Sequence, residues 1–293
     1  MFKHSTFLAA SVAAAVLAQA PAFAASSSTA SLSNFTITLY DLDPLDGIAS
    51  SITFAGLSYS YVLVSSPTLG STFDGFHEGT AAFDASISSA TIGLASAYAS
   101  STGGGSQATY TGSSPTLVGT LTAGGQASGG SPGSDSAAYA AQSFWNEYTS
   151  STFTVSANTL VMFSATGHVN AAVTHGYTGL PNDFESSHGS VGLWVSGPSS
   201  GGSGFQLSSA LLELSVDNTT FSNGSQGDRT GNLGVSFVNF GSGNLEGEFL
   251  ASAAADGLSF APAVPEPETY ALMLAGLGAL GYMSRRRKGA SKA

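Results

Sequence analysis

Three aspartates in one short segment come nearest to the spacing of a metal site. Asp41, Asp43 and Asp46 fall within DLDPLDG, and calcium prefers several hard oxygen ligands from a tight loop. The spacing departs from the calcium-loop pattern, because the third carboxylate comes one place late and Ile52 stands where a bidentate glutamate would be. Asp-Pro and Asp-Gly also form turns without any metal. We therefore expect a strand-connecting turn, with calcium as the alternative and no other cofactor.

Two further groups of residues could carry chemistry. Asp74 and Glu78 lie together in FDGFHEG, and glycoside hydrolysis requires a pair of carboxylates. The surrounding glycines instead favour a solvated loop, and nothing local fixes the separation of the two acids. His168, His175 and His188 do not have the spacing of zinc ligands. The sequence also has no nucleophile elbow, phosphate-binding loop or dinucleotide fingerprint, so we expect no catalysis.

Aromatic side chains offer a third kind of chemistry, the stacking of sugar rings. Trp145, Tyr148 and Trp194 have the amphipathic character that suits them to exposed binding surfaces. Three hypotheses follow for the body of the protein. The first is a non-catalytic surface or matrix protein, the second a glycan-binding module using these aromatics, and the third a secreted glycan hydrolase using Asp74 and Glu78.

The elements that must position these residues are strands. In NFTITLY, Phe35, Ile37 and Leu39 alternate with polar residues, which is the period of a half-buried strand. LVMFSATGHVNAAV and ALLELSVD repeat the alternation, and polar turn clusters separate such segments. Many short strands without a convincing internal helix predict an all-β fold, a single β-sandwich of jelly-roll type.

Two segments are less regular. In SITFAGLSYSYVLV the apolar parity changes at Gly56, from positions 52 and 54 to positions 57, 59, 61 and 63, which predicts a bulge or a strand break. From Ser100 to Ser136 the chain is rich in glycine and serine, with apolar residues mainly around Thr116–Leu121. There we expect one hairpin with long flexible flanks.

Composition limits what the body can bind. The chain has no cysteine, which excludes disulfides, thiol catalysis and cysteine-ligated metals. Two of the 18 acidic residues lie in the C-terminal tail, and Arg229 alone of the seven basic residues lies in the body. The body therefore carries a net charge of about −15, which repels nucleic acid and excludes it as a partner.

The N-terminal segment has the features of a secretory signal peptide. Lys3 and His4 form a short polar start, an apolar run follows, and Ala22-Phe23-Ala24 is a small-x-small cleavage pattern. We expect residues 1–24 to form a signal helix and signal peptidase to cut between Ala24 and Ala25 after Sec export. The body is then residues 25–262.

The C-terminal segment, residues 263–293, has three ordered parts. Pro265, Glu266 and Pro267 come first, and the 14 residues Tyr270–Met283 carry no charge. Arg285, Arg286, Arg287 and Lys288 follow directly. The apolar run is short for a membrane helix, and clustered cations stay on the cytoplasmic side, so the body would lie outside. A permanent single-span anchor and a buried helix of the body are the alternatives.

These residues resemble the PEP-CTERM sorting signal of Gram-negative bacteria. The resemblance rests on Val264-Pro265-Glu266-Pro267, the short apolar helix containing Gly276-Leu277, and the terminal arginine cluster. It implies that the membrane enzyme exosortase recognises the motif, removes the tail and passes the protein to the cell surface or the exopolysaccharide matrix. The opening of the body, LSNFTITLYDLDPLDGIASSITF, also resembles a β-rich domain that often precedes such tails and supplies no activity.

Together these observations predict an exported, non-catalytic protein of the cell surface or extracellular matrix. Its expected partners are signal peptidase, exosortase and exopolysaccharide, with the membrane as a transient partner through the C-terminal helix. In this scheme Pro265, Glu266 and Pro267 present the cut site, and the residues Arg285–Lys288 fix orientation.

Overall fold

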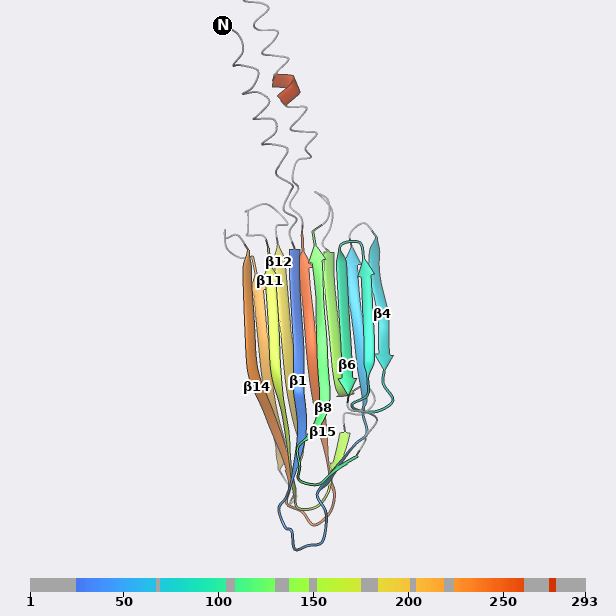
Figure 1. Cartoon of the computed structure of the whole chain (residues 1–293), viewed down its shortest axis with the longest axis vertical. Helices are drawn as coiled ribbons and strands as arrows, with labels where there is room; N and C mark the ends of the chain where they lie inside the picture. The colour runs from blue at the N-terminus through green and yellow to red at the C-terminus, as the bar shows by residue number, and fades with distance from the viewer. Residues whose placement is uncertain are drawn as a thin grey trace, which may run out of the picture.

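In a computed structural model of the protein, most of the described residues lie in strands (Figure 1). The structure describes residues 25–66, 69–103, 109–129, 137–147, 152–174, 184–200, 204–218, 224–260 and 274–277. The strands are β1 (Ala25–Asp41), β2 (Ser51–Phe54), β3 (Leu57–Ser66), β4 (Gly70–Glu78), β5 (Ser86–Ile92), β6 (Ala95–Gly103), β7 (Thr109–Thr111), β8 (Thr116–Ser128), β9 (Ala137–Glu147), β10 (Thr152–Val155), β11 (Thr159–Val173), β12 (Glu185–Pro198), β13 (Phe205–Asp217), β14 (Ser225–Asn239) and β15 (Leu245–Ser259). The all-β expectation is confirmed.

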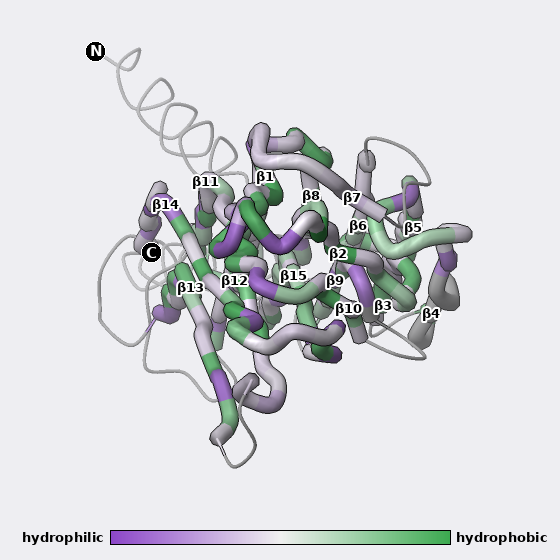
Figure 2. Tube along the Cα trace, turned by 90° about the horizontal axis from the view of Figure 1, so that it is seen from below, coloured by the Kyte–Doolittle hydropathy of each residue, from purple (hydrophilic) through white to green (hydrophobic). Residues whose placement is uncertain are grey.

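The strands form two antiparallel sheets that face each other (Figure 2). Sheet A has the order β14-β11-β1-β8-β6-β5. Sheet B has the path β4-β3-β9-β15-β10-β2-β7, and β12 joins β15 to the edge strand β13. The first strand, β1, pairs with β11 and β8, and the last strand, β15, pairs with β12, β9 and β10. Both ends of the body are therefore built into the middle of a sheet.

The core lies between the sheets and is formed by alternate residues of each strand. Phe35, Ile37 and Leu39 are buried, as the alternation in NFTITLY predicts. The same holds for every second residue of β11, including Val161 and Phe163. Phe163 of sheet A stacks on Phe249 of sheet B with their ring centroids 4.2 Å apart. Aromatic side chains thus join the two sheets.

The expected change of parity at Gly56 is wrong. The chain does leave the sheet between β2 and β3, but Ser58, Ser60, Val62 and Val64 continue the inward parity of β2. The larger side chains alternate to the outside, where Tyr59 stacks on Phe144 of β9 with their ring centroids 4.7 Å apart. The buried Ser60 hydroxyl donates to Ser88 Oγ of β5 at 3.3 Å, and Ser88 Oγ donates to the Ser60 carbonyl at 2.9 Å, whereas the buried Ser58 hydroxyl has no hydrogen-bond partner among the described residues.

The glycine-rich segment also folds differently from the expectation of one hairpin with flexible flanks. Residues Thr116–Ser128 form β8, which lies inside sheet A between β1 and β6. Its small residues provide space for rings from neighbouring strands. A Cβ atom at Gly124 would lie 2.5 Å from the Tyr98 ring, and one at Gly125 would lie 2.2 Å from the Tyr139 ring. The lack of large side chains therefore reflects close packing in this part of the sheet.

Candidate functional site

The two ends of the body are the first candidate site, because both processing signals adjoin them. Strand β1 begins at Ala25, the residue that the expected signal cleavage would expose. The Ala25 nitrogen donates to Thr174 Oγ1 at 2.9 Å, and the Thr174 nitrogen donates to the Ala25 carbonyl at 2.9 Å. Ala24 and the rest of the predicted signal peptide lie outside the described residues. Residues that directly follow the predicted cut thus belong to the first described strand.

The C-terminal end leaves the body beside the N-terminal one. Strand β15 ends at Ser259, and Ser28 Oγ of β1 donates to the Asp256 carbonyl of β15 at 3.2 Å (Figure 1). Pro265, Glu266, Pro267 and the cluster Arg285–Lys288 lie outside the described residues. Only residues 274–277 of the tail are described, as a helical turn. Among the described residues, no helix is both long and apolar enough to cross a bilayer.

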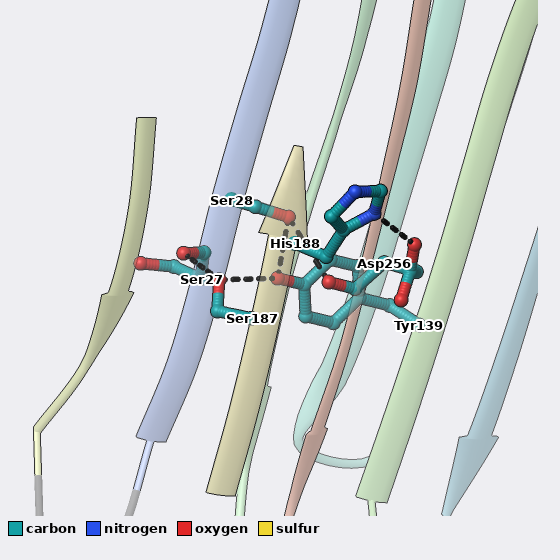
Figure 3. A network of polar contacts seen from close by, with 6 residues as sticks. All are labelled: Ser27, Ser28, Tyr139, Ser187, His188 and Asp256. Atoms are coloured by element: carbon teal, nitrogen blue, oxygen red, sulfur yellow. Dashed lines mark hydrogen bonds and ion pairs between the residues drawn. The ribbon is translucent and has the colours of Figure 1, made fainter. Parts of the chain in front are cut away.

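A buried polar network closes the interior near these two ends (Figure 3). The Tyr139 hydroxyl lies 2.8 Å from Ser28 Oγ and 3.4 Å from Ser187 Oγ, and Ser187 Oγ also donates to the Ser27 carbonyl. Burial raises the pKa of Tyr139 to about 12. A Cβ atom at Gly257 would lie 2.5 Å from the Tyr139 ring, so this ring is packed closely as well as hydrogen-bonded. The network joins β1 of sheet A to β9 and β12 of sheet B and therefore helps to hold the two sheets together.

We expect Tyr139 to make the protein sensitive to alkali. Its pKa is raised in the folded state, so its contribution to stability is complete below pH 10 and is lost as the pH rises from about 10 to 12. A shift of this size corresponds to about 2–3 kcal/mol. In denaturant titrations, Tyr139→Phe should lower the free energy of unfolding by about 1 kcal/mol at neutral pH. It should also reduce the loss of stability between pH 10 and 12.

Some alkaline loss should remain in this variant, because burial also raises the pKa of Tyr110 to about 12. Tyr98→Phe is the matched control, since Tyr98 is an exposed tyrosine of sheet A. An alkaline loss in Tyr139→Phe that equals the wild-type loss would contradict the role assigned to Tyr139.

The aspartate loop at the other end of the body is organised by its own carboxylates. Asp41 accepts from the Asp43 nitrogen at 3.0 Å, Asp43 from the Leu45 nitrogen at 3.2 Å, and Asp46 from the Ile48 nitrogen at 2.7 Å. The hydrogen bond from Asn158 to Asp46, at 2.8 Å, together with that from Ile48 lowers the Asp46 pKa. These are the side-chain turns expected of Asp-Pro and Asp-Gly.

No group of three or more His, Cys, Asp or Glu side chains that could hold a metal ion occurs among the residues that the structure describes. The calcium site at Asp41, Asp43 and Asp46 therefore stays a prediction from the sequence. In the structure, these three residues form a turn in which each carboxylate accepts a backbone hydrogen bond.

The proposed hydrolytic carboxylates lie on a strand, which corrects the expected loop. Asp74 and Glu78 both belong to β4, and Glu78 is paired with Tyr59 of β3 and exposed. The nearby Asp84 accepts from the Thr80 hydroxyl at 2.6 Å and from the Thr80 nitrogen at 2.9 Å, which lowers its pKa. Asp84 thus stabilises the loop that follows β4.

Histidine and aspartate form two hydrogen-bonded pairs on the outer faces of the sheets. His168 Nε2 lies 2.8 Å from Asp228, and His188 Nδ1 lies 3.1 Å from Asp256. Ser187 precedes His188, but strand alternation turns its hydroxyl inward while His188 lies outside (Figure 3). These two neighbours therefore cannot act together as nucleophile and base.

The aromatic residues suggested for glycan stacking are separated by the fold. Trp145 is fully buried between Phe35 and Phe83, with ring centroids 5.1 Å and 5.8 Å away, so its proposed role as an exposed platform is wrong. Its parity on β9 directs it inward. Trp194 is half-buried on the outer face of sheet B, and Tyr148 lies outside the described residues.

The charged residues of the strands are divided unequally between the two sheets, a feature that sequence reasoning missed. In the strands of sheet A, the only Asp, Glu, Lys or Arg residues are Asp41, Asp228 and Arg229. The strands of sheet B carry nine acidic residues and no Lys or Arg: Asp74, Glu78, Glu147, Glu185, Glu213, Asp217, Glu246, Glu248 and Asp256. The charge of each strand can be compared from the sequence, but only the sheet order shows that the acidic strands belong to one sheet.

The C-terminal motif provides the decisive comparison with known proteins. Residues 263–288 match the family model of the PEP-CTERM protein-sorting motif. The chain carries a PEP-CTERM motif. The PEP-CTERM motif begins four residues after Ser259, the last residue of β15, so it directly follows the folded body. It implies an exported protein that exosortase processes and sorts to the surface through its C-terminal tail.

Comparisons of the whole chain add little to this. No curated protein matches the sequence. One similar solved structure comes from work on carbohydrate-binding modules of the β-sandwich superfamily; it shares 7% identity, covering 79% of this chain and 97% of that one, with a TM-score of 0.11. A likeness at that score supports no conclusion about the β body beside the PEP-CTERM motif.

Proposed function

We propose that the protein is a non-catalytic component of the cell surface or exopolysaccharide matrix of a Gram-negative bacterium. The observation that carries this proposal is the PEP-CTERM motif at residues 263–288, immediately after the last strand of a folded β body. In this proposal the tail directs the protein to the cell surface, and the β body is the part that remains there.

Transient membrane anchoring is part of the proposal. The uncharged run Tyr270–Met283 holds the chain at the inner membrane, and the cluster Arg285–Lys288 keeps its end on the cytoplasmic side. Exosortase then removes the tail. The position of the motif supports this order, because β15 is an inner strand and only residues 260–264 separate it from Pro265. Five residues span at most about 18 Å when extended, so the cut-site motif lies close to the folded body during processing.

A structural role for the body is supported by what its polar groups do. The carboxylates of Asp43, Asp46 and Asp84 accept hydrogen bonds from loop backbone, and the Tyr139 hydroxyl is bonded inside the interior. These hydrogen bonds link strands and loops and therefore stabilise the fold.

We expect the mature body to be found with the extracellular polymer only in a host that has exosortase. Cells with and without exosortase would be separated into inner-membrane, surface and polymer fractions, and the protein would be followed by an antibody against the body. Intact-mass measurement would report whether the tail is present. With exosortase, the polymer fraction should contain a tail-less form, and without it the full-length protein should remain in the inner membrane.

A strain whose exosortase is restored from a plasmid serves as the control for this comparison. Mature surface material that retains residues 263–293 would contradict the proposal and would show instead a permanent anchor. A protein recovered equally from the polymer fraction of both hosts would contradict it as well.

A further inference from the structure

We propose that the outer face of sheet A binds a neutral polysaccharide chain. This inference deepens the proposed matrix function, on which it rests, by naming the surface and the chemistry of the polymer. The surface differs from the aromatic site suggested by the sequence, since Trp145 is buried and Trp194 lies on the other sheet.

The first step in the argument is charge. Soluble protein surfaces usually carry charged side chains of both signs. On the outer face of the described sheet A strands the one carboxylate with a side-chain partner is Asp228, which is hydrogen-bonded to His168, although the body as a whole is strongly acidic. The nine acidic residues of the sheet B strands lie on the other layer. A broad face of this protein is thus nearly free of charge.

The second step is the chemistry of that face. Because the strand registers align, side chains of neighbouring strands form rows across the sheet. One row runs through Thr230, His168, Ser31, Thr122, Ser100 and Ile87. Hydroxyl groups both donate and accept, so those already paired, such as Ser100 and Thr122 at 2.6 Å, keep capacity for a further partner. Four of its six residues carry hydroxyl groups, which are also the groups that a sugar polymer presents.

The third step is an exposed ring in the next row. Tyr98 is 47% exposed and lies against Gly124, where a Cβ atom would come within 2.5 Å of its ring. The row continues from Gly124 through Thr29 and Asn170 to Asp228. An aromatic ring, a hydroxyl, an amide and a carboxylate thus follow one another across five strands, a width of about 19 Å at the usual strand spacing. This is enough for several sugar rings.

Charge and composition together select the occupant. An acidic polymer would be repelled by a body with a net charge of about −15. A protein partner or a second copy is disfavoured because protein interfaces depend on buried aromatic and arginine anchors and contain little serine. A cation would prefer the acidic sheet B. A neutral polysaccharide can form hydrogen bonds with the hydroxyl and amide groups of this face, is not repelled by the negative charge and needs no arginine anchor.

The test compares matched substitutions on the two faces. Thr122→Glu and Ser252→Glu each replace a half-buried outward hydroxyl on an inner strand, the first on sheet A and the second on sheet B. Tyr98→Ala removes the exposed ring. Mature protein recovered from the surface of an exosortase-bearing host would be run through gels containing dextran, mannan or xylan, with alginate as the acidic polymer. Melting curves would confirm that each variant is folded.

We expect at least one neutral polymer to retard the wild-type protein, and alginate to have no effect. Thr122→Glu and Tyr98→Ala should weaken the retardation at least tenfold, whereas Ser252→Glu should change it less than twofold. Binding to none of the neutral polymers, binding to alginate alone, or a loss confined to Ser252→Glu would overturn the inference.

This result is separable from the proposed sorting. If the tail proves to be retained, full-length protein solubilised in detergent can be run in the same gels. Retardation that depends on Thr122 would then support the polysaccharide face even though the sorting proposal had failed.

Discussion

Replacing Pro265, Glu266 and Pro267 together by alanine should abolish removal of the C-terminal tail while leaving export intact. We expect the two prolines to hold Glu266 in an extended backbone and to stop an apolar helix from continuing toward the body. The uncharged run and the cations are unchanged, so insertion and orientation should be preserved. Immunoblots of fractionated cells should show the uncut form in the inner membrane, at least tenfold enriched over wild type.

The matched variant neutralises the cluster Arg285–Lys288 by glutamine and leaves the motif intact. Because we propose that these cations set the topology, this change should reduce membrane retention and give mixed orientation. Protease added to spheroplasts would distinguish the two variants by the accessibility of the body. Normal processing of the alanine variant would show that the PEP-CTERM motif is not what exosortase recognises here.

Phe163→Ala should destabilise the body by about 3–5 kcal/mol, the usual cost of removing a buried aromatic side chain. Phe163 is fully buried and lies between the sheets, stacked on Phe249 at 4.2 Å and close to Phe35 at 6.3 Å. Its loss leaves a cavity where sheets A and B are joined. Urea unfolding of the mature protein, followed by tryptophan fluorescence, should show the change, because Trp145 lies in the same cluster.

Met162→Ala is the control for this prediction. Met162 is the preceding residue on β11, and 42% of its surface is exposed on the outer face of sheet A. Its truncation should change the free energy of unfolding by about 0.5 kcal/mol or less. Similar effects of the two substitutions would mean that the inward parity of β11 is assigned incorrectly.

The sequence predicts part of the fold well because some of its information is local. Alternation in NFTITLY and in LVMFSATGHVNAAV separates a large apolar set from a polar set, so one face of each strand can only be the buried one. The sequence also predicts the turn at Asp41, Asp43 and Asp46, since each carboxylate bonds to backbone two residues further on. Both predictions depend only on residues that are close together in the sequence.

The inward face of β3 and the environment of Trp145 could not be predicted in this way. In β3 both parities contain apolar side chains, and Tyr59 and Tyr61 are larger than Ser58 and Ser60. The space between the sheets decides which set lies inside, and here it accommodates Ser60 opposite Ser88 of β5. Trp145 is drawn inside by Phe35 and Phe83, which are far from it in sequence.

By itself the sequence determined that the protein consists of strands and that its C-terminal tail is a PEP-CTERM motif, because strand period and sorting motif are both contiguous patterns. Only the tertiary structure decided that β1 and β15 lie side by side at one end of the body, and that sheet A has a nearly uncharged outer face. The physical reason is that strand pairing joins residues more than a hundred positions apart, such as Ser31 with His168, and no local pattern specifies such a partner.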